Sequence, residues 1–226
     1  MNKERRLDFI GIAGITLLVF AGMYFSLSAK DVFTGAGFVF GIVYFFLYRA
    51  VTRKSFEEMH FSARSLGKWL KQPGIWGWIL LPAAVNLLQT AAARFISPPF
   101  YGETVRDELT RISVLVPTGV TADFLVLIPY LLVLAMGEEI CFRAFFQDRL
   151  AHYVPAGLAI LLSSIVFTAG HVASEPLGVA AFWVLNTFVL SILFGVIQKK
   201  TKNAYVSTIS HFVSNYLAFV LIYFLK

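Results

Sequence analysis

Uncharged apolar runs of roughly 20 residues dominate the pattern of hydrophobic and polar positions along this chain. A helix needs about 20 apolar residues to cross the ~30 Å hydrocarbon core of a bilayer. The pattern therefore predicts an all-α, polytopic membrane protein with about seven transmembrane helices. The expected spans lie near residues 9–27, 32–48, 75–93, 119–149, 153–171, 176–198 and 204–225. No internal repeat or long linker divides them, so we expect a single transmembrane domain over residues 1–226, with Pro82 kinking the third span.

The segment between the second and third spans has a helical period of a different kind. Apolar residues recur along it at Phe56, Met59, Ala63, Leu66 and Leu70. Basic residues occupy other positions, at Arg64, Lys68 and Lys71. This arrangement is typical of a short amphipathic helix lying flat in the cytoplasmic membrane interface. We interpret it as a packing or anchoring helix rather than a substrate gate, because an amphipathic stripe usually means burial.

Composition supports the membrane assignment. Hydrophobic residues make up 58% of the chain and charged residues 14%, and the mean hydropathy is +0.74. A net charge of +6 does not indicate nucleic-acid binding here, because basic cytoplasmic loops account for it. The single cysteine, Cys141, excludes an intramolecular disulfide.

Basic residues predict the orientation. They gather at the amino terminus, between residues 49 and 71, near Arg143 and Arg149, and at residues 199–202. All four groups fall on one side when seven spans alternate. Because cytoplasmic loops carry excess lysine and arginine, we expect a cytoplasmic amino terminus.

Charged side chains in the fourth span are the strongest functional indication. Glu138 and Glu139 are adjacent, and Arg143 follows them. Charge in hydrocarbon costs several kcal/mol unless it is paired or hydrated, so such residues are candidate site residues. Glu139 and Arg143, four residues apart, share a helix face and can neutralise each other. Glu138 lies about 100° around the helix and has no such partner.

Three further polar side chains lie in later spans. His171 ends the fifth span, and His211 and Asn215 share a face of the seventh. A carboxylate without a cationic partner beside imidazoles is suited to act as a general base. At 1.5 Å per residue, Glu138, His171 and His211 lie at depths of about 18, 24 and 14 Å. They can meet only if helices tilt or the fourth helix extends past Arg143. We therefore predict a helix continuing to about Arg149 and a water-filled site open to the cytoplasm.

Three motifs on successive spans carry a family resemblance. They are Glu-Glu-x-x-x-Arg at 138–143, Phe-x-x-x-His at 167–171 and His-x-x-x-Asn at 211–215. In this order inside apolar spans they resemble the CPBP (Abi) family of CAAX prenyl endopeptidases and bacteriocin-processing proteases. Phe188, Phe194 and Gly195 loosely match a fourth family element. The resemblance covers roughly the last 100 residues, and we expect the catalytic core within residues 119–226.

The resemblance implies an intramembrane endopeptidase with defined residue roles. Glu138 would activate water with help from His171, while His211 and Asn215 would stabilise the oxyanion and Glu139 and Arg143 would support them. A divalent metal such as zinc, held by Glu138, His171 and His211, is an alternative. Because the His-Glu-x-x-His signature is absent, the metal-free mechanism is slightly favoured. Cys141 has no matching role.

The implied partners are the lipid bilayer and a membrane-bound peptide or lipidated, CAAX-type protein substrate, with no nucleic acid. The small size and the breadth of the family favour a bacterial plasma membrane. Two other functions remain open from the sequence: a proton-coupled transporter, and a non-catalytic bacteriocin-immunity or scaffold protein that keeps the polar cluster for binding.

Overall fold

The computed structural model describes residues 2–28, 35–96, 120–172 and 177–224, and every regular element in these ranges is a helix. The helices are α1 (Lys3–Ser28), α2 (Ala36–Thr52), α3 (Ala63–Leu70), α4 (Pro73–Ile96), α6 (Val120–Glu139), the π-helix η1 (Ile140–Gln147), α7 (Asp148–Leu150), α8 (Ala156–Ala169), α9 (Leu177–Thr201) and α10 (Ala204–Phe224). The all-α prediction holds throughout these ranges. Small parts of the expected spans, at residues 32–34, 119, 176 and 225, lie outside them.

Three of the described helices are long and apolar enough to cross a membrane. They are α1, residues Pro73–Ala93 of α4 and residues Ala181–Thr201 of α9. Helices α2 and α8 are apolar but shorter. These helices indicate an integral membrane protein, while the count of seven spans stays a prediction.

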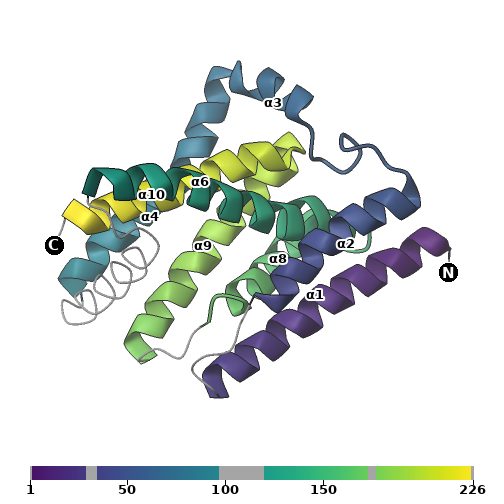
Figure 1. Ribbon diagram of the computed structural model, residues 1–226, viewed down its shortest axis with the longest axis horizontal. Coiled ribbons are helices and arrows are strands. Elements are labelled where there is room, and N and C mark those ends of the chain that lie inside the picture. The colour runs from purple at the N-terminus through teal and green to yellow at the C-terminus, as the bar shows by residue number, and fades with distance from the viewer. Residues whose placement is uncertain (1, 29–34, 97–119, 173–176, 225–226) are drawn as a thin grey trace.

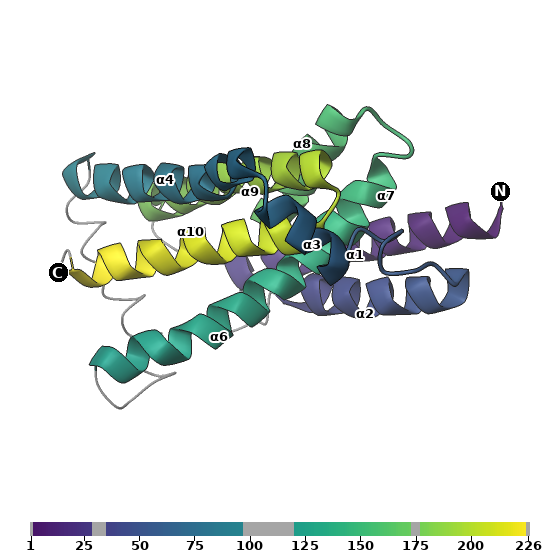
Figure 2. The same cartoon turned by 90° about the horizontal axis from the view of Figure 1, so that it is seen from above.

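The helices surround the π-helical segment. Helices α1 and α2 pack against each other, as do α4 and α10, and the two pairs lie toward opposite ends of the molecule (Figures 1 and 2). Segment η1 lies between them and contacts α1, α2, α8, α9 and α10. All eight of its side chains are buried. The segment that carries Arg143 and directly follows Glu138 and Glu139 is therefore enclosed by other helices.

Close approach of α2 to η1 requires a glycine. A β-carbon at Gly41 would overlap the Sγ atom of Cys141. The Cys141 side chain is fully buried at this crossing. Cys141 thus fills space between two helices.

Helix α3 is shorter than the sequence pattern suggested. It begins at Ala63, with the Ser62 hydroxyl accepting a hydrogen bond from the Ser65 amide at its amino end. His60 takes a left-handed backbone conformation (φ 54°), which separates the preceding turn from the helix. Apolar side chains of α3 pack against a buried cluster from α4, α9 and α10, made of Ile75, Ile79, Ile197 and Val206. The helix therefore packs on the protein, and Phe56 and Met59 precede it.

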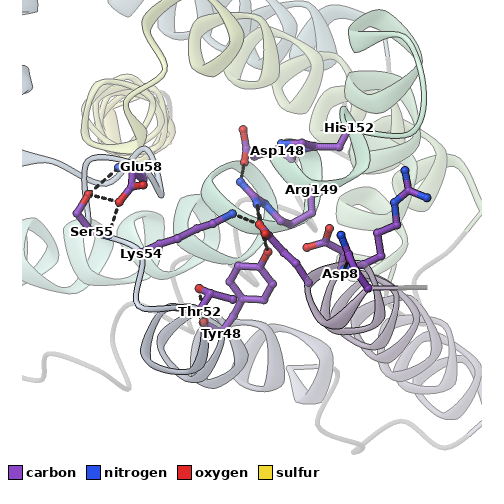
Figure 3. A network of polar contacts seen from close by, with 12 residues as sticks. Asp8, Tyr48, Thr52, Lys54, Ser55, Glu58, Asp148, Arg149 and His152 are labelled. Carbon is purple, nitrogen blue, oxygen red and sulfur yellow. Dashed lines mark hydrogen bonds and ion pairs between the residues drawn. The ribbon is translucent and has the colours of Figure 1, made fainter.

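A network of polar contacts joins the ends of α1, α2 and α7 (Figure 3). The Arg149 guanidinium, 3% exposed, donates to the Tyr48 hydroxyl at 3.2 Å and pairs with Asp148. Tyr48 in turn donates to Glu4, which also pairs with Lys54. These contacts fix the first helix and the end of α2 to the carboxyl end of the α6–η1–α7 helix.

Glu58 lies in the turn before α3, and its hydrogen bonds within the described part of the chain are with Ser55. The backbone amide and hydroxyl of Ser55 both donate to its carboxylate at 2.8 Å (Figure 3). These hydrogen bonds hold the pKa of Glu58 below its usual value. The turn is thus a capped local structure, separate from the network around Arg149.

Candidate active site

One unbroken helical segment carries both glutamates of the first motif. Helix α6, segment η1 and α7 follow one another without a gap from Val120 to Leu150, so the prediction of a helix reaching about Arg149 is confirmed. The π-helical character of residues 140–147 was not predicted. A π-helix has i→i+5 hydrogen bonds and is frequent at functional sites. It begins directly after Glu139, so its wider turn changes the directions of the side chains that follow.

Glu138 faces two imidazoles from two other helices. Its Oε1 lies 3.6 Å from Nε2 of His171, and its Oε2 lies 3.5 Å from Nε2 of His211. The Glu138 side chain is 11% exposed. The structure thus brings together one carboxylate and two histidines that are far apart in the sequence.

The short length of α8 places His171 inside the helical bundle, beside Glu138. Its 14 residues span about 21 Å, less than the ~30 Å hydrocarbon core, so the helix ends before it could cross. The ring Nδ1 of His171 lies 2.8 Å from the Phe167 carbonyl oxygen. Because a carbonyl only accepts, Nδ1 carries a proton and Nε2 faces Glu138. His171 is 40% exposed, which makes it the open side of the cluster.

His211 lies between the two glutamates. Its Nδ1 is 3.0 Å from Oε1 of Glu139, and its Nε2 faces Glu138. The Phe194 ring stacks on the imidazole with a centroid distance of 4.4 Å and an interplanar angle of 22°. The His211 side chain is 5% exposed. Both of its nitrogens and one of its faces are therefore engaged, which fixes the orientation of the ring.

Glu139 and Arg143 form the ion pair that their spacing predicted. Arg143 Nε lies 3.5 Å from Glu139 Oε2, and both side chains are 0% exposed. Nη2 of Arg143 also donates to Ser191 of α9, at 2.9 Å to the hydroxyl and 3.2 Å to the carbonyl oxygen. The guanidinium lies over the Phe167 ring, 4.4 Å from its centroid. A buried charge needs such partners, because desolvating it without them costs several kcal/mol.

Asn215 is the predicted site residue with the fewest contacts. It follows His211 by one turn of α10 and is partly exposed. Within the described part of the chain its side chain makes no hydrogen bond. No hydrogen bond with a described residue holds the Asn215 amide group, whereas the side chains of His211 and Glu139 are held by each other.

Sequence reasoning did not find Ser191 or the packing role of the aromatic rings. Ser191 has no conspicuous motif, and its partner Arg143 is 48 residues away. Phe167 contacts both Arg143 and His171, and Phe194 contacts His211. The spacing of four between Phe167 and His171 was a usable indication, because such residues share a helix face.

The donor atoms of the cluster are chemically suited to a divalent metal. Two imidazole nitrogens and a carboxylate form a known catalytic zinc set. Among the described residues, however, no three His, Cys, Asp or Glu side chains are arranged as a metal-binding group. Glu138, His171 and His211 would hold such an ion only after a local adjustment of their side chains.

A family model matches the part of the chain that carries all of these residues. Residues 120–217 match the model described as type II CAAX prenyl endopeptidase Rce1-like. The range starts at the first residue of α6 and ends within α10. Comparisons with curated proteins and with solved structures gave no match.

The match and the motifs agree with each other. The matched range contains Glu138, Glu139, Arg143, His171, His211 and Asn215. It therefore confirms the family resemblance drawn from these motifs. Residues 120–217 of this chain are therefore similar to the family described as type II CAAX prenyl endopeptidase Rce1-like.

Proposed function

We propose that this protein is an intramembrane endopeptidase in which Glu138 activates a water molecule to hydrolyse a peptide bond. The observation that carries the proposal is the convergence of the Glu138 carboxylate with Nε2 of His171 and Nε2 of His211, at 3.6 and 3.5 Å. A base that removes a proton from water has to be within hydrogen-bond reach of it, directly or through one intervening group.

The charges around the two glutamates distinguish their roles. Glu139 is neutralised by Arg143 and receives the Nδ1–H of His211, so its oxygens are engaged. Glu138 has no guanidinium or ammonium partner in the described structure; it faces only imidazoles. Glu138 is therefore the carboxylate free to accept a proton from water, and His171 on the exposed side helps to bind and orient that water.

Oxyanion stabilisation is assigned to α10. The tetrahedral intermediate of peptide hydrolysis carries a negative oxygen, and donors aimed at it usually make the largest contribution to catalysis. His211, held by Glu139, can donate through Nε2 when it is protonated. Asn215, one turn further along, can supply its amide group. Its freedom from other hydrogen bonds within the described residues leaves that amide available to a substrate.

The substrate class follows from the position of the site among apolar helices and from the family. We propose a membrane-associated or lipidated, CAAX-type protein or peptide that reaches the site from the cytoplasmic face of a plasma membrane. If a divalent metal takes part, Glu138, His171 and His211 are the residues that would hold it, and it would polarise the scissile carbonyl or its attacking water. The metal-free mechanism remains the one we favour.

The decisive experiment compares Glu138→Gln with the parent protein in a purified cleavage assay. The substrate is a prenylated CAAX peptide in detergent or proteoliposomes. Glutamine keeps the shape of the side chain but cannot accept the proton, so we expect turnover to fall at least about 100-fold. Glu57→Gln is the control, because Glu57 is exposed and lies outside the site. Equal cleavage by Glu138→Gln and the parent would remove Glu138 from the mechanism.

Two additional arms address the metal and the substrate. Preincubation with a chelator should leave the parent's turnover unchanged; a loss restored by added zinc would replace the metal-free mechanism. Mass spectrometry of peptides that accumulate in cells carrying Glu138→Gln should reveal the natural substrate and its cleavage site. Immunity or transport that persists in this variant, with no proteolysis by either form, would overturn the enzyme assignment.

A further inference from the structure

Ser191 is a polar residue of α9 that the proposed chemistry does not use. It is 1% exposed and lies opposite η1. Its hydroxyl oxygen accepts from Nη2 of Arg143 at 2.9 Å, and its carbonyl oxygen accepts from the same nitrogen at 3.2 Å. Among the contacts of the described residues, these are the two hydrogen bonds of Arg143 with another helix.

The orientation of Arg143 determines what Glu139 can do. A guanidinium is planar, so fixing Nη2 at Ser191 also fixes the direction in which Nε points. Nε lies 3.5 Å from Oε2 of Glu139, an ion-pair distance without a hydrogen bond, while Oε1 lies 3.0 Å from Nδ1 of His211. Arg143 bonded in another orientation could compete with His211 for Oε1.

The contacts thus form a continuous chain from α9 to the site. It runs from Ser191 to Arg143, then to Glu139, then to Nδ1 of His211, and Nε2 of the same ring faces Glu138. All four side chains before Glu138 are at most 5% exposed. Water therefore cannot easily replace a missing partner in this series of contacts.

We infer that Ser191 is a positioning residue: by orienting Arg143 it keeps Glu139 bonded to Nδ1 of His211 and so keeps Nε2 directed into the site. The inference rests on the proposed endopeptidase function. Ser191 touches neither water nor substrate in this account. Its effect should therefore appear in kcat, with little change in KM.

A double-mutant cycle tests this order of action. We expect Ser191→Ala to lower kcat about 10-fold, the size of a lost hydrogen bond to a charged group. In a Glu139→Gln background the same change should cost less than about twofold, because the connection is already broken. Ser191→Thr, which keeps the hydroxyl, should recover most of kcat. Equal losses in both backgrounds would show that Ser191 acts only through packing and would overturn the inference.

Ser163→Ala is the matched control. Ser163 is also 1% exposed, and its hydroxyl donates to the Phe142 carbonyl of η1 at 3.2 Å without touching Arg143. We expect it to destabilise the protein to a similar extent while leaving kcat unchanged. A comparable fall of kcat in Ser163→Ala would mean that any lost contact with η1 has this effect, and would contradict a specific role for Ser191.

A second readout does not require activity. In protein labelled with ¹⁵N-histidine, the ring nitrogens report which one is protonated, and the chain has four histidines. Ser191→Ala should change the Nδ1–H resonance of His211 and leave that of His171 in place; loss of the signal in His211→Gln assigns it. An unchanged spectrum would overturn the inference even if the parent cleaves peptides. A changed spectrum in a protein without proteolysis would instead reject only the proposed function.

Discussion

At the residue scale, the adjacent glutamates Glu138 and Glu139 have different environments. Glu139 is fully buried and paired with Arg143, whereas Glu138 faces two histidines next to the exposed side of the cluster. One residue of displacement along a helix turns a side chain by about 100°, which is enough to give the two carboxylates different partners. In the proposed mechanism the paired Glu139 holds the site together, and Glu138, which has no guanidinium or ammonium partner among the described residues, reacts.

Glu139→Gln and Arg143→Met should each destabilise the protein strongly. Removing one member of a buried ion pair leaves the other charge without a partner, at a cost of about 3–5 kcal/mol. The double variant removes both charges, so its loss of unfolding free energy should be well below the sum of the single losses. Thermal or denaturant unfolding in detergent of the parent, the two single variants and the double variant measures this coupling.

Glu57→Gln with Lys71→Met provides the control cycle for that measurement. Both side chains are exposed, and each substitution should change stability by less than about 0.5 kcal/mol. Additive losses in the Glu139 and Arg143 cycle would show that the two charges do not stabilise each other, despite the 3.5 Å between them.

The sequence predicted these contacts only in part, for a physical reason. Spacing along one helix predicts which residues share a face, so the pairing of Glu139 with Arg143 could be predicted. Spacing contains no information about which neighbouring helix lies opposite. The contacts of Arg143 with Ser191 and of His211 with Glu139 depend on that tertiary arrangement.

At the element scale, hydrophobic patterning predicted where the helices lie but not their internal geometry. The expected spans at residues 75–93 and 204–225 correspond to α4 (Pro73–Ile96) and α10 (Ala204–Phe224). The π-helix at Ile140–Gln147 could not be predicted, because α- and π-helices bury the same kinds of apolar residues. Straight helices also predicted different depths for Glu138, His171 and His211. The short α8 and the packing of the helices bring these three side chains together instead.

Gly41 tests how closely α2 has to approach η1. An alanine β-carbon there would overlap Cys141 Sγ, so we expect Gly41→Ala to destabilise the protein by about 1–3 kcal/mol despite its better helix propensity. Adding Cys141→Ala removes the overlapping sulfur and should restore part of the loss. Thermal unfolding of the two single variants and the double variant in detergent measures both effects.

Gly77→Ala is the matched glycine control. Gly77 lies in α4, is exposed, and has no atom within 4 Å of an added β-carbon. Alanine should leave stability unchanged or raise it by up to about 1 kcal/mol, because helical glycine costs backbone entropy. A loss at Gly41 that Cys141→Ala does not relieve would show that the backbone, rather than the sulfur, limits the approach of α2.

At the scale of the whole molecule, the helices outside the family match support those inside it. Helices α1 and α2 precede residue 120, yet both contact η1, and Tyr48 of α2 bonds to Arg149 at the end of α7. The polar network in Figure 3 therefore connects the amino-terminal helices to the segment that carries Glu138. A substrate of the proposed reaction would approach a segment that both parts of the chain enclose.

The side of the membrane from which substrate approaches depends on the orientation of the bundle. Excess lysine and arginine near α3 predict that this helix faces the cytoplasm, and alternation then places the end of α1 on the opposite side. Cys141→Ala removes the one native cysteine, so a single cysteine introduced elsewhere reports on which side of the membrane it lies. Lys68→Cys marks α3, and Ser28→Cys marks the end of α1; both positions are exposed.

A membrane-impermeant maleimide should label Ser28→Cys in intact cells and Lys68→Cys only in inverted vesicles. This result follows because the bilayer separates the two positions and the reagent reaches one face at a time. Labelling of both cysteines from the same face would mean that α2, which connects the two positions, does not cross the membrane. The reverse pattern would place α3 outside the cytoplasm. In that case a substrate that carries its lipid anchor on the cytoplasmic leaflet could not reach Glu138 by the proposed route.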